Sequence, residues 1–123
     1  MDKAQLLQAV EKSIAEARAW ADSGWPMTFG GRGEAVNSLG EAEAKSERFV
    51  YRQEAINYWR DVQEMGEECA ASAEKAKAAL ESGSPQRAAD QLYFASFVEK
   101  RTNMVGRSPL FDPLWKAAQA LVR

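Results

Sequence analysis

The spacing of hydrophobic and polar positions predicts helices along most of the chain. In residues 3–22, apolar side chains such as Leu7, Val10 and Ile14 recur every three or four residues, while charged side chains occupy the other positions. This is the pattern of an amphipathic helix with one buried face. Residues 109–122 show the same spacing and predict a C-terminal helix.

The central part of the chain predicts a long helix over about 38–82. An apolar stripe runs from Phe49 to Leu80 at helical spacing. Ser38, followed three residues later by a glutamate, matches the start signal of a helix. The pattern leaves open whether residues 34–45 merge with the long helix or form a short one.

Three residues mark a sharp turn after this helix. Gly83 is suited to the left-handed backbone that ends many helices, Ser84 can cap the next helix, and Pro85 fits its first position. The end and the next start are so close that the following helix, predicted over 84–105, must fold back antiparallel.

Residues 23–33 predict the one long irregular segment. Four glycines and one proline within eleven residues argue against any regular element there. The segment also contains Trp25, Met27 and Phe29, which are unusual in a disordered stretch. We therefore expect an ordered Gly-rich loop.

Together these elements predict an all-α fold: a four- to five-helix bundle built on a long antiparallel helical hairpin, as a single domain over residues 1–123. A chain of 123 residues can bury a core without metal or disulfide. The run from Leu92 to Val98 is apolar on nearly every face, so we expect helix 84–105 to be central.

Composition excludes several classes of function. The chain has no histidine, which removes Ser-His-Asp and Cys-His catalysis and histidine-bound metals. Its net charge of −2 supplies no basic field for nucleic acid, and no apolar run is long enough for a membrane span. The single cysteine, Cys69, and the polar N-terminal residues fit a reducing compartment, so we expect a cytoplasmic protein.

Acidic residues offer one candidate metal site. Asp61, Glu64 and Glu68 are spaced so that they share one face of the predicted long helix. Three carboxylates together can bind Mg²⁺ or Mn²⁺. The competing interpretation is an ordinary solvated acidic face, and we expect no cofactor.

The Gly-rich loop offers a candidate contact site for a partner or a ligand. Trp25, Met27 and Phe29 are residue types that are enriched in interfaces, and Arg32 lies among glycines where backbone N–H groups can hold a phosphate. The alternative is that these side chains fold onto the end of the bundle as a lid.

The sequence therefore favours a small non-enzymatic interaction module, such as an adaptor, regulator or inhibitor, with a protein partner and no catalytic residue. The alternative is a helical bundle that binds a small molecule or a divalent metal, possibly as an enzyme, through loop 23–33 and the acidic face. We also expect a homodimer, because five large aromatic residues exceed what a narrow bundle can bury. They are Trp20, Tyr58, Trp59, Phe111 and Trp115.

Overall fold

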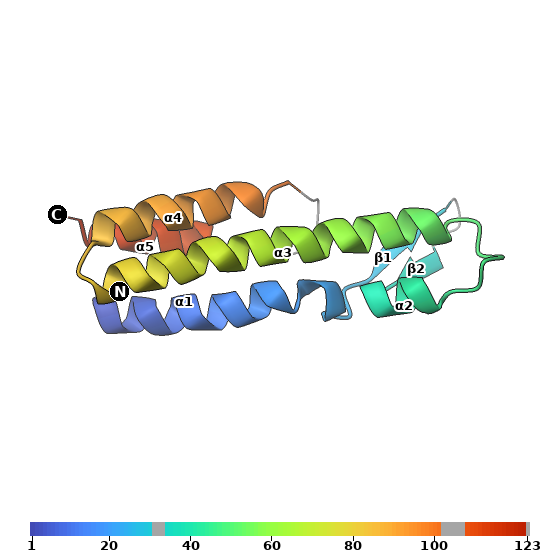
Figure 1. The fold of residues 1–123 in the computed structure, drawn as a ribbon, viewed down its shortest axis with the longest axis horizontal. Coiled ribbons are helices and arrows are strands. Elements are labelled where there is room, and N and C mark those ends of the chain that lie inside the picture. The colour runs from blue at the N-terminus through green and yellow to red at the C-terminus, as the bar shows by residue number, and fades with distance from the viewer. Residues whose placement is uncertain (31–33, 102–107, 123) are drawn as a thin grey trace.

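The structure is a computed structural model that describes residues 1–30, 34–101 and 108–122. These residues form five α-helices, a 3₁₀ helix and a two-stranded sheet (Figure 1). The predicted helical character is confirmed, but the all-α class needs correction because of the strands. The elements are α1 (Lys3–Arg18), η1 (Trp20–Asp22), β1 (Met27–Phe29), β2 (Glu34–Val36), α2 (Leu39–Ala44), α3 (Arg52–Glu81), α4 (Pro85–Val98) and α5 (Asp112–Ala120).

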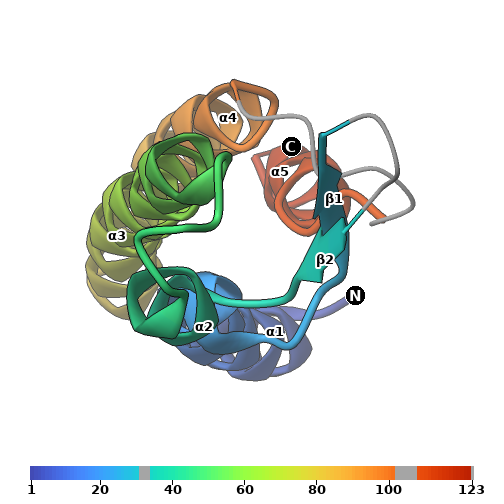
Figure 2. The same ribbon diagram turned by 90° about the vertical axis from the view of Figure 1, so that its right-hand side faces the viewer.

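Helix α3 lies at the centre of the structure and packs against α1, η1, α2 and α4. Helix α1 lies along it, α4 returns along its C-terminal half, and α5 packs against α4 (Figure 1). In the end-on view, α1 and α4 lie on opposite sides of the molecule, and α2 and the strands surround the near end (Figure 2). The expectation that helix 84–105 is central is wrong, because α3 occupies that place.

The turn between α3 and α4 contains the predicted left-handed glycine. Gly83 has φ +79°. Its N–H donates to the carbonyl oxygen of Leu80 at 3.2 Å, and the N–H of Ser84 donates to that of Ala79 at 2.8 Å. This pair of bonds is a Schellman motif, which satisfies carbonyls at the end of α3. The side chain of Ser84 makes no cap, contrary to the prediction, and Pro85 begins α4 without one.

The long helix predicted over 38–82 is divided into α2 and α3. Lys45 ends α2 with an extended backbone, at φ −60° and ψ 143°. Arg52 spans the break, because its guanidinium donates to the carbonyl oxygens of Lys45 at 2.8 Å and Glu43 at 2.9 Å. Residues 34–45 therefore do not merge with the long helix. Helix α3, with 30 residues, is about 45 Å long.

The segment predicted as an irregular loop, 23–33, contributes a strand. Strands β1 and β2 pair antiparallel, with Met27 opposite Val36. Gly30 directly follows β1 and has φ +85°. The glycines of this segment therefore lie after the first strand, where a hairpin connection favours them. The indole N–H of Trp59 in α3 donates to the carbonyl oxygen of Val36 at 3.1 Å, which ties the sheet to the long helix.

Helix α4 is shorter than the predicted 84–105 and ends at Val98. Just after it, two N–H groups donate to carbonyl oxygens three residues back. The N–H of Lys100 donates to Phe97 at 3.3 Å, and that of Arg101 to Val98 at 3.0 Å. Such three-residue bonds commonly close the last turn of a helix. Residues 102–105 of the predicted helix lie outside the described residues.

Helix α5, predicted over 109–122, begins at Asp112 and ends at Ala120. A side chain from the end of α4 binds backbone N–H groups just before α5. The carboxylate of Glu99 accepts the N–H of Leu110 at 3.0 Å and that of Phe111 at 2.9 Å. A negative side chain suits the free N–H groups at a helix start, so Glu99 links the end of α4 to the start of α5.

Gly66 lies at the closest contact between α1 and α3. A β-carbon on Gly66 would overlap the backbone carbonyl oxygen of Ala17 and lie 3.3 Å from the ring of Trp20. The neighbouring backbone that comes this close to α3 at Gly66 is that of α1. The absence of a side chain here sets the distance between the two helices.

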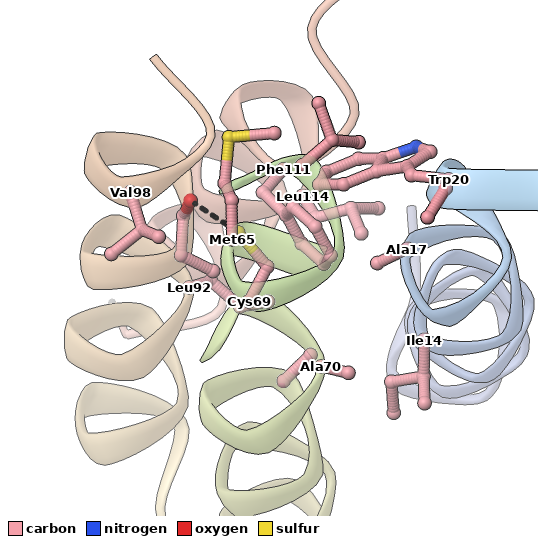
Figure 3. Close-up of a cluster of buried hydrophobic side chains, with 14 of the residues drawn as sticks. Ile14, Ala17, Trp20, Met65, Cys69, Ala70, Leu92, Val98, Phe111 and Leu114 are labelled. Carbon is pink, nitrogen blue, oxygen red and sulfur yellow. Dashed lines mark hydrogen bonds between the residues drawn. The ribbon is translucent and has the colours of Figure 1, made fainter. Parts of the chain in front are cut away.

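Large aromatic side chains fill the core beside this contact (Figure 3). Trp20 and Phe111 lie edge to face with ring centroids 6.3 Å apart, and Trp59 is fully buried. Tyr58 and Trp115 are partly buried against the same core. One chain therefore covers these five residues largely by itself, and the reason given for the homodimer is wrong for Trp20, Trp59 and Phe111.

Replacing Gly83 by alanine should lower the free energy of unfolding by about 1 kcal/mol, because a β-carbon is strained at positive φ. Gly40→Ala is the matched control. Gly40 lies inside α2, and the nearest atom that a β-carbon would meet is the Ser38 hydroxyl oxygen at 4.0 Å. Alanine should therefore be neutral or stabilising there. Urea denaturation compares the two, and equal stabilities would contradict the turn geometry.

The same substitution at Gly66 should be far more damaging. Gly66→Ala has to move the backbone of α1 away from α3, because the contact is with a carbonyl oxygen and not with a flexible side chain. We expect a loss of about 3 kcal/mol or more. Thermal and urea unfolding measure it beside Gly40→Ala. A Gly66→Ala protein as stable as the parent would mean that α1 does not pack there.

Candidate functional site

Three of the four candidate contact residues in segment 23–33 pack against the core of the chain itself. Phe29 is buried and contacts the ring of Tyr58 edge to face, with centroids 5.8 Å apart. Trp25 and Met27 are partly buried against the core. Arg32 lies outside the described residues. Phe29 in particular has little surface left for a partner.

A shallow hollow of about 370 Å³ lies at this end of the molecule. Phe49 and Tyr51 stand in its wall with ring centroids 6.1 Å apart. The Tyr51 ring lies over Gly30, where even a β-carbon would overlap it. The ammonium group of Lys45 forms a salt bridge with the carboxylate of Glu34 at 2.8 Å, so the acidic group that lines the hollow already has a cation. Among the described residues, the hollow therefore provides aromatic contact and one cationic side chain, that of Arg48.

The candidate metal residues occupy the outer face of α3. Asp61 and Glu64 are exposed. Glu68 forms a salt bridge to Arg101 at 2.8 Å, so its carboxylate already has a cation. Within the described parts of the chain, no group of three or more His, Cys, Asp and Glu side chains is placed to hold a metal ion.

Cys69 is enclosed between α3 and α4. Its side chain is fully buried, and its thiol donates to the carbonyl oxygen of Ala95 at 3.4 Å, as the dashed line in Figure 3 shows. Burial first, and then the nearby charges of Glu99 and Glu68, raise the pKa of the Cys69 thiol to about 12, although Arg101 lowers it slightly. A thiol with this pKa is protonated near neutral pH and is a poor nucleophile.

A different group of aromatic residues is exposed, on the outer face of α4. Tyr93 is 53% exposed, Phe94 51% and Phe97 63%. Tyr93 also packs on the partly buried Trp115 of α5, with ring centroids 5.0 Å apart. We call Tyr93, Phe94, Phe97 and Trp115 the aromatic surface.

The opposite face of α4 explains this exposure. Its buried residues include Ala88, Leu92 and Ala95, all with no exposed area, and they pack toward α3 and α5. These side chains are mainly small, so α4 lies close to its neighbours and needs no aromatic residue for packing. Larger apolar residues in the same run then face outward.

The sequence does contain a signal for this surface, the apolar run over residues 92–98. The run from Leu92 to Val98 predicts a helix that is buried on several sides and therefore central. Among the described elements, α4 packs on α3 and α5, and α1 lies across the molecule (Figure 2). The run itself was read correctly as helical, but its solvent face depends on the position of α1.

Charged residues border the aromatic surface along α4. Asp90 is exposed one turn before Tyr93 and accepts a hydrogen bond from Gln86 at 3.0 Å. Lys100 is exposed just after the helix ends. Among the described residues, neither Asp90 nor Lys100 forms a salt bridge, whereas Arg101 is paired with Glu68. The surface thus has an acidic border on one side and a basic border on the other.

Comparisons of the chain with protein-family models, with curated proteins and with solved structures gave no match. None of the helices in the described parts of the chain combines the length and apolar character that a membrane crossing requires. The function has to be inferred from the side chains that the fold exposes.

The raised pKa of Cys69 predicts a thiol that reacts slowly and a free energy of unfolding that falls at alkaline pH. The unfolded thiol loses its proton near pH 9, while the folded one keeps it up to about 12. The Cys69 thiol therefore makes its full contribution to the free energy of unfolding below pH 9, and this contribution is lost as the pH rises toward 12. Cys69→Ala should flatten that part of the pH dependence relative to the parent.

A thiol reagent at pH 8 measures the same burial directly. The native protein should react many times more slowly than the protein in denaturing urea, because the thiolate forms only after unfolding. Equal rates in both conditions would contradict the placement of Cys69 between α3 and α4.

Proposed function

We propose that this protein is a non-enzymatic interaction module whose binding site is the aromatic surface of α4 and α5. The observation that carries the proposal is the exposure of Tyr93, Phe94 and Phe97 on one helix face. Large contiguous apolar patches are rare on free monomers and commonly mark binding sites. Aromatic residues are also the types that contribute most to the energy of interfaces.

The architecture we propose behind this site is a helical bundle built on the α3–α4 hairpin. The aromatic residues sit on a regular helix whose other face is locked by Leu92 and Ala95. Their backbone is therefore held in place before a partner binds, which reduces the entropy lost on association. Glu99 adds to this by fixing α5, and with it Trp115, beside α4.

A catalytic or metal-dependent role has less support. The chain lacks histidine, and Cys69 is buried with a raised pKa. Glu68 is paired with Arg101, and Asp61 and Glu64 are simply exposed on α3. The hollow near Tyr51 offers aromatic walls and the side chain of Arg48 to a small molecule, but it is shallow and its Glu34 is already paired with Lys45. The alternative of a small-molecule or metal-binding bundle is therefore the weaker one.

Site-specific photo-crosslinking in cells that express the protein tests the proposal. A photoreactive phenylalanine analogue at position 94 or 97 should give discrete cross-linked proteins, because both side chains are half exposed or more. The matched control carries the analogue in place of Gln63, which is exposed on α3 among charged residues. A second variant, Phe97→Asp with the analogue at 94, should lose the products.

Products at 94 and 97 that are no stronger than those at 63 would overturn the proposal. Circular dichroism and thermal unfolding accompany each variant. Phe97→Asp should keep a near-parental melting temperature, because Phe97 is 63% exposed and contributes little to the core. Loss of cross-linking without loss of folding then reports on binding alone.

A further inference from the structure

We propose that the partner at the aromatic surface is a second copy of this chain, with α4 packed antiparallel against α4 of that copy across a two-fold axis. This inference rests on the proposed function and names its partner. The homodimer expected from the sequence relied on five aromatic residues, of which the fold buries Trp20, Trp59 and Phe111, so the argument here uses the exposed face of α4.

The outer face of α4 has the spacing of a helix–helix seam. Positions 86, 90, 93 and 97 of α4 follow one another at intervals of four, three and four residues, and Lys100 follows three residues later in the turn after the helix. Such spacing places side chains in one row along a helix and is the pattern of paired helices. All five residues are exposed, and Tyr93 and Phe97 form the apolar centre.

Two-fold symmetry and charge together select the antiparallel orientation. With the axis passing between positions 93 and 97, Tyr93 of each copy faces Phe97 of the other. The same register places Asp90 of each copy opposite Lys100 of the other, since both pairs are symmetric about position 95. Two aromatic contacts are then flanked by two ion pairs.

A parallel arrangement would have the opposite electrostatic effect. Asp90 would then lie beside Asp90 of the second copy, and Lys100 beside Lys100, so like charges would meet at both ends. Juxtaposed like charges are a common means of rejecting a wrong orientation. The charges on α4 therefore fit one arrangement of two copies and oppose the other.

Neither charge has a competing salt bridge in the part of the chain that the structure describes. Asp90 accepts only the amide of Gln86, and Lys100 forms no salt bridge among the described residues. Arg101, which is adjacent, is held by Glu68 at 2.8 Å and does not have to move. Pairing of Asp90 with Lys100 of a second copy would therefore break no salt bridge of this chain.

Light scattering during size-exclusion chromatography tests the association. The parent should elute with close to twice the chain mass of 13.6 kDa at about 100 µM, well above a micromolar dissociation constant. Phe97→Asp should return it to the chain mass, because a carboxylate would enter the apolar centre. A parent that stays at the chain mass at this concentration would overturn the inference.

Charge reversal tests the antiparallel register. Asp90→Lys alone and Lys100→Glu alone should each weaken association roughly fivefold or more, because each places like charges together twice per dimer. The double variant restores opposite charges and should return the dissociation constant to near the parental value. Glu47→Lys, an exposed charge reversal in the turn before α3, is the control and should change little.

The outcomes separate this inference from the proposed function. A double variant as weak as the single ones would overturn the antiparallel pairing. Monomeric protein that still cross-links to other proteins from position 94 or 97 would overturn self-association while the interaction module stands. Loss of both the dimer and the cross-links would overturn both proposals.

Discussion

The contact between α1 and α3 at Gly66 sets the rest of the arrangement. Because Gly66 has no side chain, the backbone of Ala17 lies directly against α3, and Trp20 follows immediately after α1. Trp20 then packs edge to face on Phe111, which stands at the start of α5. One missing side chain in α3 thus allows the first and last helices of the chain to share a core.

The same close packing explains why the apolar residues of α4 are divided between core and surface. The inner face needs only small side chains and Leu92 to fill the space toward α3 and α5. The aromatic residues that follow Leu92 face outward because α1 packs on the other side of α3 and does not cover them (Figure 2). Exposure of these rings is a consequence of the fold and not of local helix propensity.

The opposite end of the molecule combines apolar packing of α2 against α3 with polar bonds to the backbone. The indole of Trp59 binds a carbonyl oxygen of β2, and the guanidinium of Arg52 binds two carbonyl oxygens near the end of α2. These side chains leave from the first turns of α3 and satisfy backbone groups that no helix partner reaches. The N-terminal third of α3 is thereby covered without a second long helix.

The sequence by itself determined the helical character of most of the chain and the turn at Gly83, because periodicity and turn chemistry are local. It could not locate the break before Arg52, since the bonds that stabilise it join residues seven and nine apart. It missed the strands because Met27 pairs with Val36 across a glycine-rich connection. Only the tertiary structure decided that Phe29 is buried and Phe97 exposed, because burial depends on which helix a side chain meets.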